Sequence, residues 1–203
     1  GCFNISTEDE KELFNMYYLR ALKEGTKLHI LEKHRSNFGP IVLDIDIKYE
    51  SNNNERYYNL DVIQQVIKIQ NEVMNKYLSI NTKNTIAFVS EKNAPALNSG
   101  NIYKDGFHVM YPKIWTEYKI QHIIRKEVVE KFKQNNYMKV LNPINSYDDI
   151  FDSQVIQKNG WFLYGSGKPK CDNYKLTHII DSKLKIKDKS KFLSDIESLT
   201  QLL

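Results

Sequence analysis

The chain of 203 residues has only two cysteines, Cys2 and Cys171, and neither belongs to a CxxC pair. Two cysteines are too few for a disulfide framework, and the missing CxxC spacing argues against the common zinc sites. The chain has no apolar run of about 18 residues, the length that a transmembrane helix needs, so no membrane contact is expected. The N-terminus, GCFNISTEDE, is polar and acidic, unlike a signal peptide. We therefore expect a soluble protein of a reducing, intracellular compartment.

The remaining composition is that of a globular protein, with 41% hydrophobic and 27% charged residues. This length suffices for one large domain or two small lobes with a real core. The net charge of +4 is too small to identify a class of partner. The abrupt start at Gly1 suggests a piece of a longer chain.

Hydrophobic periodicity and turn residues predict a mixed arrangement of helices and strands. The predicted helices cover residues 6–22, 60–78 and 116–134, and a charged tail from Ser182 ends in a helix at Leu203. The predicted strands cover residues 27–31, 41–47, 85–90, 106–112, 160–164 and 175–180. Loops are expected at 51–55, 91–101 and 142–149. Because strands and helices do not alternate strictly, we expect an α+β fold with an antiparallel-rich sheet.

The stretch IVLDIDIKYE places two aspartates, Asp44 and Asp46, in a predicted strand. Residues i and i+2 of a strand point to the same face, so both carboxylates share one face, and Ile45 and Ile47 lie on the other. Like charges at such positions repel. A divalent cation such as Mg²⁺ or Mn²⁺, which prefers hard oxygen ligands, would remove that repulsion. The alternative is an edge strand with one solvated face.

The stretch NIYKDGFHVMYP adds a second candidate group, where a loop enters a strand. Gly106 would let a backbone N–H approach a ligand closely. His108 shares a strand face with Gly106 and could bind a phosphate, and Lys104 could add positive charge. A histidine in a strand can also be purely structural.

The stretch DIFDSQVIQKNGWFLYGSGKPK supplies a third group. Asp152 follows a short apolar step and could be a third acidic ligand. Ser166 and Lys168 lie among small and basic residues that suit phosphate contact. The pattern is not a Walker A loop, because Phe162 and Pro169 replace residues that such a loop needs. The alternative is a surface turn with solvated lysines.

The ordered series of these stretches resembles the three motifs of the archaeo-eukaryotic primase superfamily, which includes the primase-polymerases. IVLDIDIKY resembles motif I, GFH motif II and IFD motif III. Three stretches are most similar to the primase domains of helicase-primases from large DNA viruses: PIVLDIDIKY, KDGFHVMYP and NGWFLYGSGKP. The resemblance spans roughly residues 27–180, so residues 1–203 would form one catalytic domain with a helical tail at 182–203.

The resemblance implies an N-terminal α/β unit and an RRM-like antiparallel unit that face each other across a cleft. It implies a DNA primase or primase-polymerase that synthesises primers on single-stranded DNA from NTPs or dNTPs. Three catalytic aspartates, Asp44, Asp46 and Asp152, would hold two divalent ions, Mg²⁺ or Mn²⁺. The triphosphate would contact five further residues: Lys104, Gly106, His108, Ser166 and Lys168. If the viral similarity holds, a helicase would follow Leu203, and the protein would act at a viral replication site.

The chain departs from the family pattern in two places. Gly106 replaces the serine of motif II, which removes a hydroxyl contact. Asn159 and Phe162 stand where cellular primase-polymerases carry arginines, so this stretch would contribute fewer nucleotide contacts. No Cys/His cluster of the kind used for zinc is present in the sequence.

Two other function classes fit some of the same residues. A metal-dependent nuclease or phosphodiesterase could use the same carboxylates, but it would have no use for a triphosphate pocket. A non-catalytic nucleic-acid-binding module could use the basic face of helix 116–134, which includes Lys119, Arg125, Lys126 and Lys133. Such a module would bind DNA in a salt-dependent way without needing Asp44.

Overall fold

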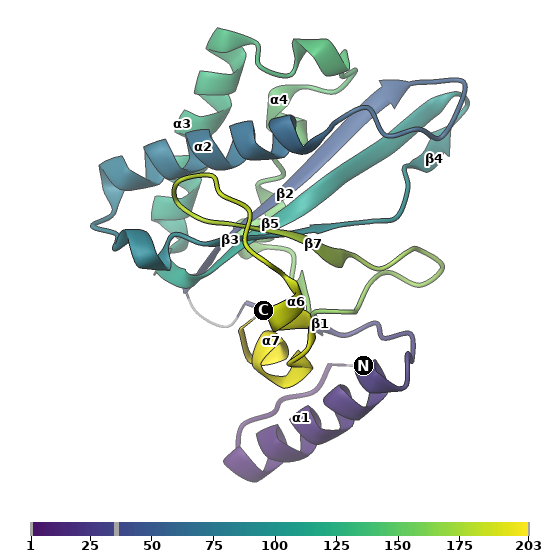
Figure 1. Ribbon diagram of the computed structural model, residues 1–203, viewed down its shortest axis with the longest axis vertical. Helices are drawn as coiled ribbons and strands as arrows, with labels where there is room; N and C mark the ends of the chain where they lie inside the picture. The colour runs from purple at the N-terminus through teal and green to yellow at the C-terminus, as the bar shows by residue number, and fades with distance from the viewer. Residues whose placement is uncertain (1, 35–36, 203) are drawn as a thin grey trace.

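The computed structural model describes residues 2–34 and 37–202, and Figure 1 shows its ribbon. Its centre is a five-stranded sheet in which all neighbours pair antiparallel. Four strands follow in the spatial order β2 (Phe38–Glu50), β5 (Ile102–Glu117), β3 (Ala87–Glu91) and β7 (Lys175–Ile180). A further strand, β4 (Ala96–Ser99), pairs with β5. A separate two-stranded sheet joins β1 (Leu31–Glu32) to β6 (Trp161–Phe162).

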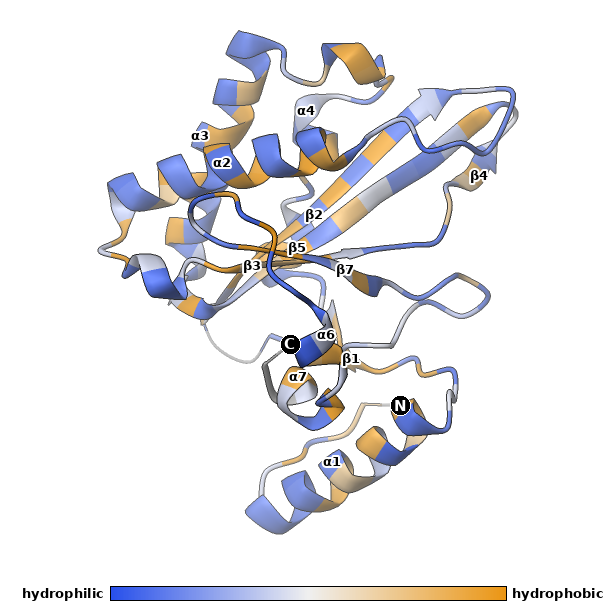
Figure 2. Ribbon diagram, viewed as in Figure 1, coloured by the Kyte–Doolittle hydropathy of each residue, from blue (hydrophilic) through white to orange (hydrophobic). Residues whose placement is uncertain are grey.

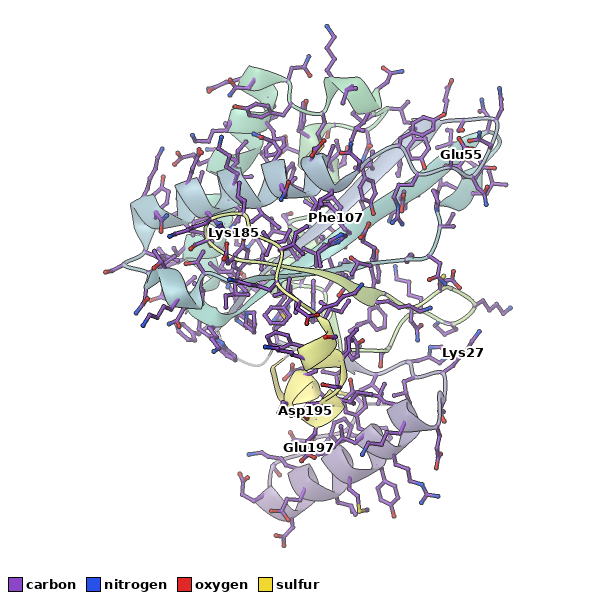
Figure 3. The ribbon with its side chains drawn as sticks, viewed as in Figure 1. Lys27, Glu55, Phe107, Lys185, Asp195 and Glu197 are labelled. Atoms are coloured by element: carbon purple, nitrogen blue, oxygen red, sulfur yellow. The ribbon has the colours of Figure 1, made fainter. Side chains whose placement is uncertain are left out.

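Two long amphipathic helices, α2 (Leu60–Tyr77) and α3 (Tyr118–Asn135), pack on one face of the central sheet (Figure 1). The Asn59 side chain caps α2 by accepting a hydrogen bond from the backbone N–H of Val62. Hydropathy alternates along β2 and β5, as period-two patterning requires (Figure 2). The side chain of Phe107 is fully buried in this core (Figure 3).

The other face of the sheet is covered only in part. The helix α1 (Glu8–Lys23) begins with a capping box formed by Thr7 and Glu10. The short helices α6 (Ser190–Leu193) and α7 (Ile196–Leu202) lie beside α1 in Figure 1. Leu199 joins a second apolar cluster with residues of β3 and β7. The β2 and β5 part of this face is polar, and it carries the residues described below.

The predicted fold class is confirmed, because β2, α2, β3, β5, α3 and β7 follow each other in the βαββαβ order of an α+β unit. The shorter elements are η1 (Thr82–Asn84), η2 (Lys139–Leu141), α4 (Tyr147–Ile150) and α5 (Gln154–Gln157). The predicted loops 91–101 and 142–149 were wrong in part, since β4 lies within the first and α4 begins within the second. Strand β4 exists because β5 extends far enough to pair with it, which local patterning does not show.

The predicted strand 160–164 is also shorter in the structure, where only Trp161 and Phe162 pair. Their partners are the two residues of β1, so the predicted strand 27–31 overlaps β1 only at Leu31. The described part of the tail forms α6 and α7, and its predicted end at Leu203 lies outside the described residues.

Candidate active site

The antiparallel pairing of β2 with β5 brings the first two motifs together. Asp44 lies opposite His108, and Asp46 lies opposite Gly106. Ile45 and Ile47 are fully buried on the helix-covered face, with 0% and 1% exposed surface. The predicted division of this strand into an acidic face and an apolar face is therefore present in the structure.

Each aspartate of the pair faces a basic side chain from β5. Asp46 Oδ2 lies 2.7 Å from Lys104 Nζ, and Asp44 Oδ1 lies 3.4 Å from His108 Nε2. A separation of 3.4 Å is too long for a good hydrogen bond. Asp44 Oδ1 is accordingly a buried acceptor for which the described residues provide no hydrogen-bond donor. Cross-strand charge thus offsets part, but not all, of the repulsion between the two carboxylates.

The surroundings move the pKa values of the two carboxyl groups in opposite directions. Burial alone would raise the pKa of Asp44, but the nearby charges of His108, Lys104 and Lys168 lower it overall. For Asp46, burial and then the negative charge of Asp44 raise the pKa, despite the ion pair with Lys104. The three predicted basic residues therefore gather around one acidic pair.

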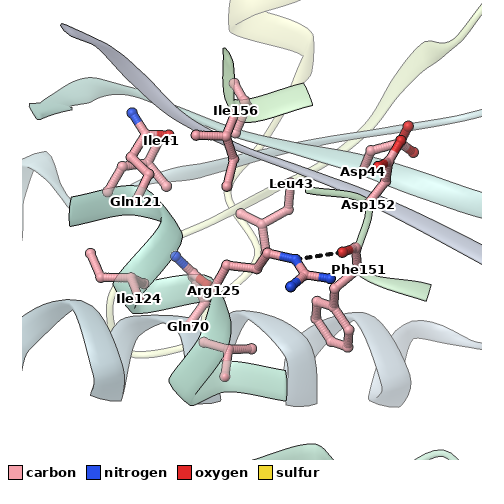
Figure 4. A pocket seen from close by; sticks show the side chains of 12 residues that line it. Ile41, Leu43, Asp44, Gln70, Gln121, Ile124, Arg125, Phe151, Asp152 and Ile156 are labelled. Carbon is pink, nitrogen blue, oxygen red and sulfur yellow. Dashed lines mark hydrogen bonds between the residues drawn. The ribbon is translucent and has the colours of Figure 1, made fainter. Parts of the chain in front are cut away.

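The third aspartate lies beside the first through the backbone. The N–H of Asp152 donates to the carbonyl of Asp44 over 3.0 Å, and Phe151 forms an isolated bridge with Ile45. The Asp152 carboxylate accepts a hydrogen bond from the Gln154 N–H at 2.8 Å. Asp44 and Asp152 line the same small pocket, shown from close by in Figure 4.

Arg125 fixes the segment that carries Asp152. From α3, its Nε donates to the Phe151 carbonyl over 2.7 Å, and its Nη2 donates to the Asp148 carbonyl over 2.6 Å (Figure 4 draws the first bond). The sequence analysis placed Arg125 on a basic helix face that one alternative, a non-catalytic module, would use for nucleic acid. In the structure its guanidinium instead supports the third motif.

The oxygen ligands that the acidic pair offers suit a hard divalent cation in part. Two carboxylates on one face, and a buried oxygen of Asp44 without a hydrogen bond, match the ligand preference of Mg²⁺ or Mn²⁺. Across residues 2–34 and 37–202, however, no three His, Cys, Asp or Glu side chains form a group that could hold a metal. The structure therefore brings Asp44 and Asp46 onto one face, while Asp152 joins them through its backbone.

Close packing of β5 against β2 requires glycine at position 106, which the sequence did not indicate. A Cβ at this position would lie 1.7 Å from the carbonyl oxygen of Ile45, so any larger residue would push β5 away from β2. The carbonyl of Gly106 also accepts a hydrogen bond from the Tyr58 hydroxyl at 2.8 Å. The expectation that glycine serves a ligand remains a prediction.

The GSGKPK stretch is anchored in the molecule at Gly167, whereas Lys168 and Lys170 are exposed, as the alternative of a surface turn expects. The Gly167 N–H donates to the Leu28 carbonyl over 3.1 Å, and the His29 ring lies 2.7 Å from the Gly167 carbonyl. Ser166 is 2% exposed, and its hydroxyl makes no hydrogen bond with the described residues. It lines a pocket that also contains His108 and Tyr174. Ser166 thus lies close to the second motif, but inside the fold.

Sequence reasoning missed two aromatic residues at this site. The ring of Tyr174 stacks on the His108 imidazole with 3.6 Å between centroids, and Trp161 contacts the same imidazole at 4.7 Å. Trp161 lies in the stretch NGWFLYGSGKP without having been assigned a role, and Tyr174 belongs to no motif. Its position in a polar loop gave no signal.

The geometry defines an α+β domain with a polar sheet face that carries an acidic pair, a histidine and Lys104, with Lys168 of the GSGKPK stretch near them. A family model described as "C962R protein N-terminal AEP domain" matches residues 1–180. The chain is also 36% identical over 168 residues, 83% of its length, to "Putative helicase L207/L206" of Acanthamoeba polyphaga mimivirus. That alignment covers 17% of the viral protein's length.

The chain belongs to the family of archaeo-eukaryotic primase (AEP) domains. This confirms the resemblance drawn from the three motifs. Within the described residues, no helix is both long enough and apolar enough to cross a membrane.

Proposed function

We propose that the chain is a primase-type nucleotidyltransferase that synthesises primers on single-stranded DNA from NTPs or dNTPs. One observation carries the proposal: the same-face pair Asp44 and Asp46 lies on β2 beside His108 of the neighbouring strand β5, with Lys104 and Lys168 near it. Acidic oxygens for cations and basic groups for a triphosphate are the two parts that nucleotidyl transfer needs.

In this proposal Asp44, Asp46 and Asp152 hold two divalent ions, Mg²⁺ or Mn²⁺. Bound ions would supply activation of the attacking hydroxyl and stabilisation of the leaving pyrophosphate. The lowered pKa of Asp44 keeps its carboxylate charged at neutral pH, ready to bind a cation. Asp152 would turn its carboxylate from the Gln154 N–H toward the pair when cations bind.

The basic residues would hold the triphosphate of the incoming nucleotide. Lys104 and His108 reach the acidic pair from β5, and Lys168 approaches Asp44 from the GSGKPK stretch. A nucleotide would compete with Asp46 for Lys104, while the cations take over the charge of the carboxylates. Gly106 and Ser166 complete the proposed nucleotide contacts.

The test is template-directed primer synthesis on single-stranded DNA with Mg²⁺ or Mn²⁺. We expect Asp44→Asn and Asp46→Asn each to lower synthesis by about 10²-fold or more, the range for removal of one electrostatic group from an active site. Asp61→Asn, at an exposed residue in the first turn of α2, is the control. Wild-type synthesis by both site variants would overturn the assignment.

DNA degradation and DNA binding, measured alongside synthesis, separate the two alternatives. A nuclease would degrade the DNA and leave the nucleotide pool unchanged. A non-catalytic module would bind DNA equally well after chelation of metal or loss of Asp44. Lys119, Lys133 and Arg125 of α3 are already paired with acidic side chains of this chain, which argues against a dedicated basic surface there.

We extend the proposal to the longer protein. The viral relative carries the word helicase in its description, and the aligned part is a small fraction of its length. A helicase module beside this domain would expose the single strand on which the primase acts. Primer synthesis on duplex DNA by the full-length protein, but not by this domain, would be the expected difference.

A further inference from the structure

The imidazole of His108 is held mainly by rings. Among the described residues, the charged group that contacts His108 is Asp44, whose Oδ1 lies 3.4 Å from His108 Nε2. This distance is too long for a hydrogen bond that would fix the orientation of the ring by itself. The Tyr174 ring, in contrast, stacks on the imidazole with planes 20° apart and centroids 3.6 Å apart. The Trp161 ring lies with its centroid 4.7 Å from that of the imidazole, and the two ring planes are tilted by 39°. Stacking of this kind restricts rotation of the imidazole.

The ring of Tyr174 is itself in contact with a charged group, the ammonium of Lys92. The Lys92 ammonium lies 5.0 Å from the centroid of its ring, in the geometry of a cation–π contact. Burial, followed by the negative charges of Asp44, Asp46 and Asp105, raises the pKa of its hydroxyl. Lys92, which directly follows β3, thus contacts the Tyr174 ring beside the acidic pair.

The contacts of the rings bear on which role Tyr174 has. Tyr174 lines a pocket together with His108 and Ser166. One face of the Tyr174 ring is stacked on the imidazole with 3.6 Å between centroids, so that face is not free to stack on a base. The contact favours a role of Tyr174 in holding His108.

We propose that Tyr174 is a positioning residue, which sets the orientation in which His108 meets the nucleotide triphosphate. This inference rests on the proposed function, because it needs His108 to bind phosphate. Trp161 assists from β6. Through Tyr174, the segment that leads into β7 becomes part of the nucleotide site, although no motif includes it.

The experiment compares three variants by nucleotide binding and by steady-state primer synthesis. Tyr174→Phe keeps the stacked ring, Tyr174→Leu removes it, and His108→Ala removes its target. We expect Tyr174→Leu to raise KM and the nucleotide Kd by about five- to tenfold, the loss of roughly one aromatic contact, with kcat changed less. Tyr174→Phe should restore wild-type values.

A spectroscopic measurement tests the contact without activity. Protons of the His108 ring are shielded by a stacked tyrosine, so their NMR signals should move downfield in Tyr174→Leu and stay in place in Tyr174→Phe. The control is Tyr57→Leu, which removes another stacked tyrosine, 4.3 Å from Tyr49. It should change neither the His108 signals nor nucleotide binding.

The outcomes separate this inference from the proposed function. If His108→Ala weakens nucleotide binding but Tyr174→Leu does not, the positioning role is wrong and the function stands. If His108→Ala binds nucleotide like the wild type, the proposed nucleotide site fails, and the inference fails with it. If Tyr174→Phe is as impaired as Tyr174→Leu, the hydroxyl rather than the stack matters, which also overturns the positioning role.

Discussion

At the scale of single residues, the site is built on close approach between β2 and β5. Gly106 has no room for a side chain, because its Cβ would meet the Ile45 carbonyl. The absent side chain keeps the acidic pair of β2 within reach of Lys104 and His108. The glycine of the second motif therefore has a structural role that is independent of any ligand.

Gly106→Ala is expected to be strongly destabilising. Relief of a 1.7 Å contact with backbone requires the two strands to separate locally. We expect the free energy of unfolding to fall by about 3 kcal/mol or more, at the upper end for overpacked sites. Chemical denaturation measures the change.

Gly100→Ala is the matched control for this substitution. Gly100 has a φ of +55° and no atom within 4 Å of a Cβ, so alanine there meets only backbone strain. A loss of about 1 kcal/mol is expected. Equal losses at Gly100 and Gly106 would contradict the steric explanation.

Much of the residue-level pattern was predictable because it is local. The alternation of Asp44 and Asp46 with Ile45 and Ile47 depends only on the two-residue period of a strand. The stack of Tyr174 on His108 was not predictable, because these residues lie far apart in the chain and meet only through the pairing of β7 with β3 and β3 with β5.

At the scale of elements, a single side chain joins the long helix α3 to the short helix α4 and its C-cap residue, Phe151. Arg125 connects α3 to the backbone of residues 148–151, directly before Asp152. We expect Arg125→Met to lower primer synthesis by about tenfold to a hundredfold, because small displacements of a catalytic group cost that much. Primer assays on folded protein, checked by circular dichroism, measure the effect.

Lys126→Met is the control for Arg125→Met, since Lys126 is an exposed neighbour on the same helix. If α3 acted by binding DNA phosphates, both variants would weaken DNA binding and make it less dependent on salt. A selective loss of synthesis in Arg125→Met supports the structural role. The sequence placed both residues on one basic face, because helical spacing does not show that Arg125 reaches the third motif.

A second set of contacts ties β3, β5 and β7 together. Arg56 pairs with Glu91 at 2.7 Å and with Asp105 at 2.8 Å, and Thr177 donates to Glu91 over 2.5 Å. Burial would raise the pKa of Glu91, but hydrogen bonds and the Arg56 charge lower it to about 2. Asp105 directly precedes Gly106, so this set supports the second motif.

The lowered pKa of Glu91 predicts how stability depends on pH. A carboxyl group with a folded-state pKa below its unfolded value adds stability above the unfolded value, and this is lost as pH falls. For Glu91 the loss occurs between pH 4.5 and about 2. It amounts to about 3 kcal/mol.

Glu91→Gln should therefore be less stable than wild type at pH 7 and should show a shallower decline in acid. Urea unfolding at pH 7 and at several pH values between 5 and 2.5 measures both effects. Glu12→Gln, at an exposed residue of α1, should follow the wild-type curve. Parallel curves for Glu91→Gln and wild type would show that Glu91 does not carry this dependence.

At the scale of the whole molecule, the sheet separates stability from function by its two faces. The face under α2 and α3 holds the larger apolar core, whereas the β2–β5 part of the other face holds charged groups. The fold class followed from the sequence because helical and strand periods were clear. The third motif's place was not predictable, because it is set by hydrogen bonds to Arg125 and Asp44.

The charged face predicts that divalent cations stabilise the folded chain. A ligand that binds only the folded state adds about 2.7 kcal/mol at a concentration of 100 times its Kd. For a chain of this size, each 1 kcal/mol raises Tm by about 2–4 °C. Addition of Mn²⁺ to chelator-treated protein should therefore raise Tm by several degrees, measured by differential scanning calorimetry.

The double variant Asp44→Asn with Asp46→Asn decides where such cations act. It lacks the repulsion that a cation would relieve, so its Tm should respond little to Mn²⁺. Asp152→Asn should respond to an intermediate degree, because Asp152 lies beside Asp44 through its backbone while its carboxylate is bound to the Gln154 N–H in this structure. An Mn²⁺ shift of wild-type size in the double variant would place the cations elsewhere, and the acidic pair would then be balanced by Lys104 and His108 alone.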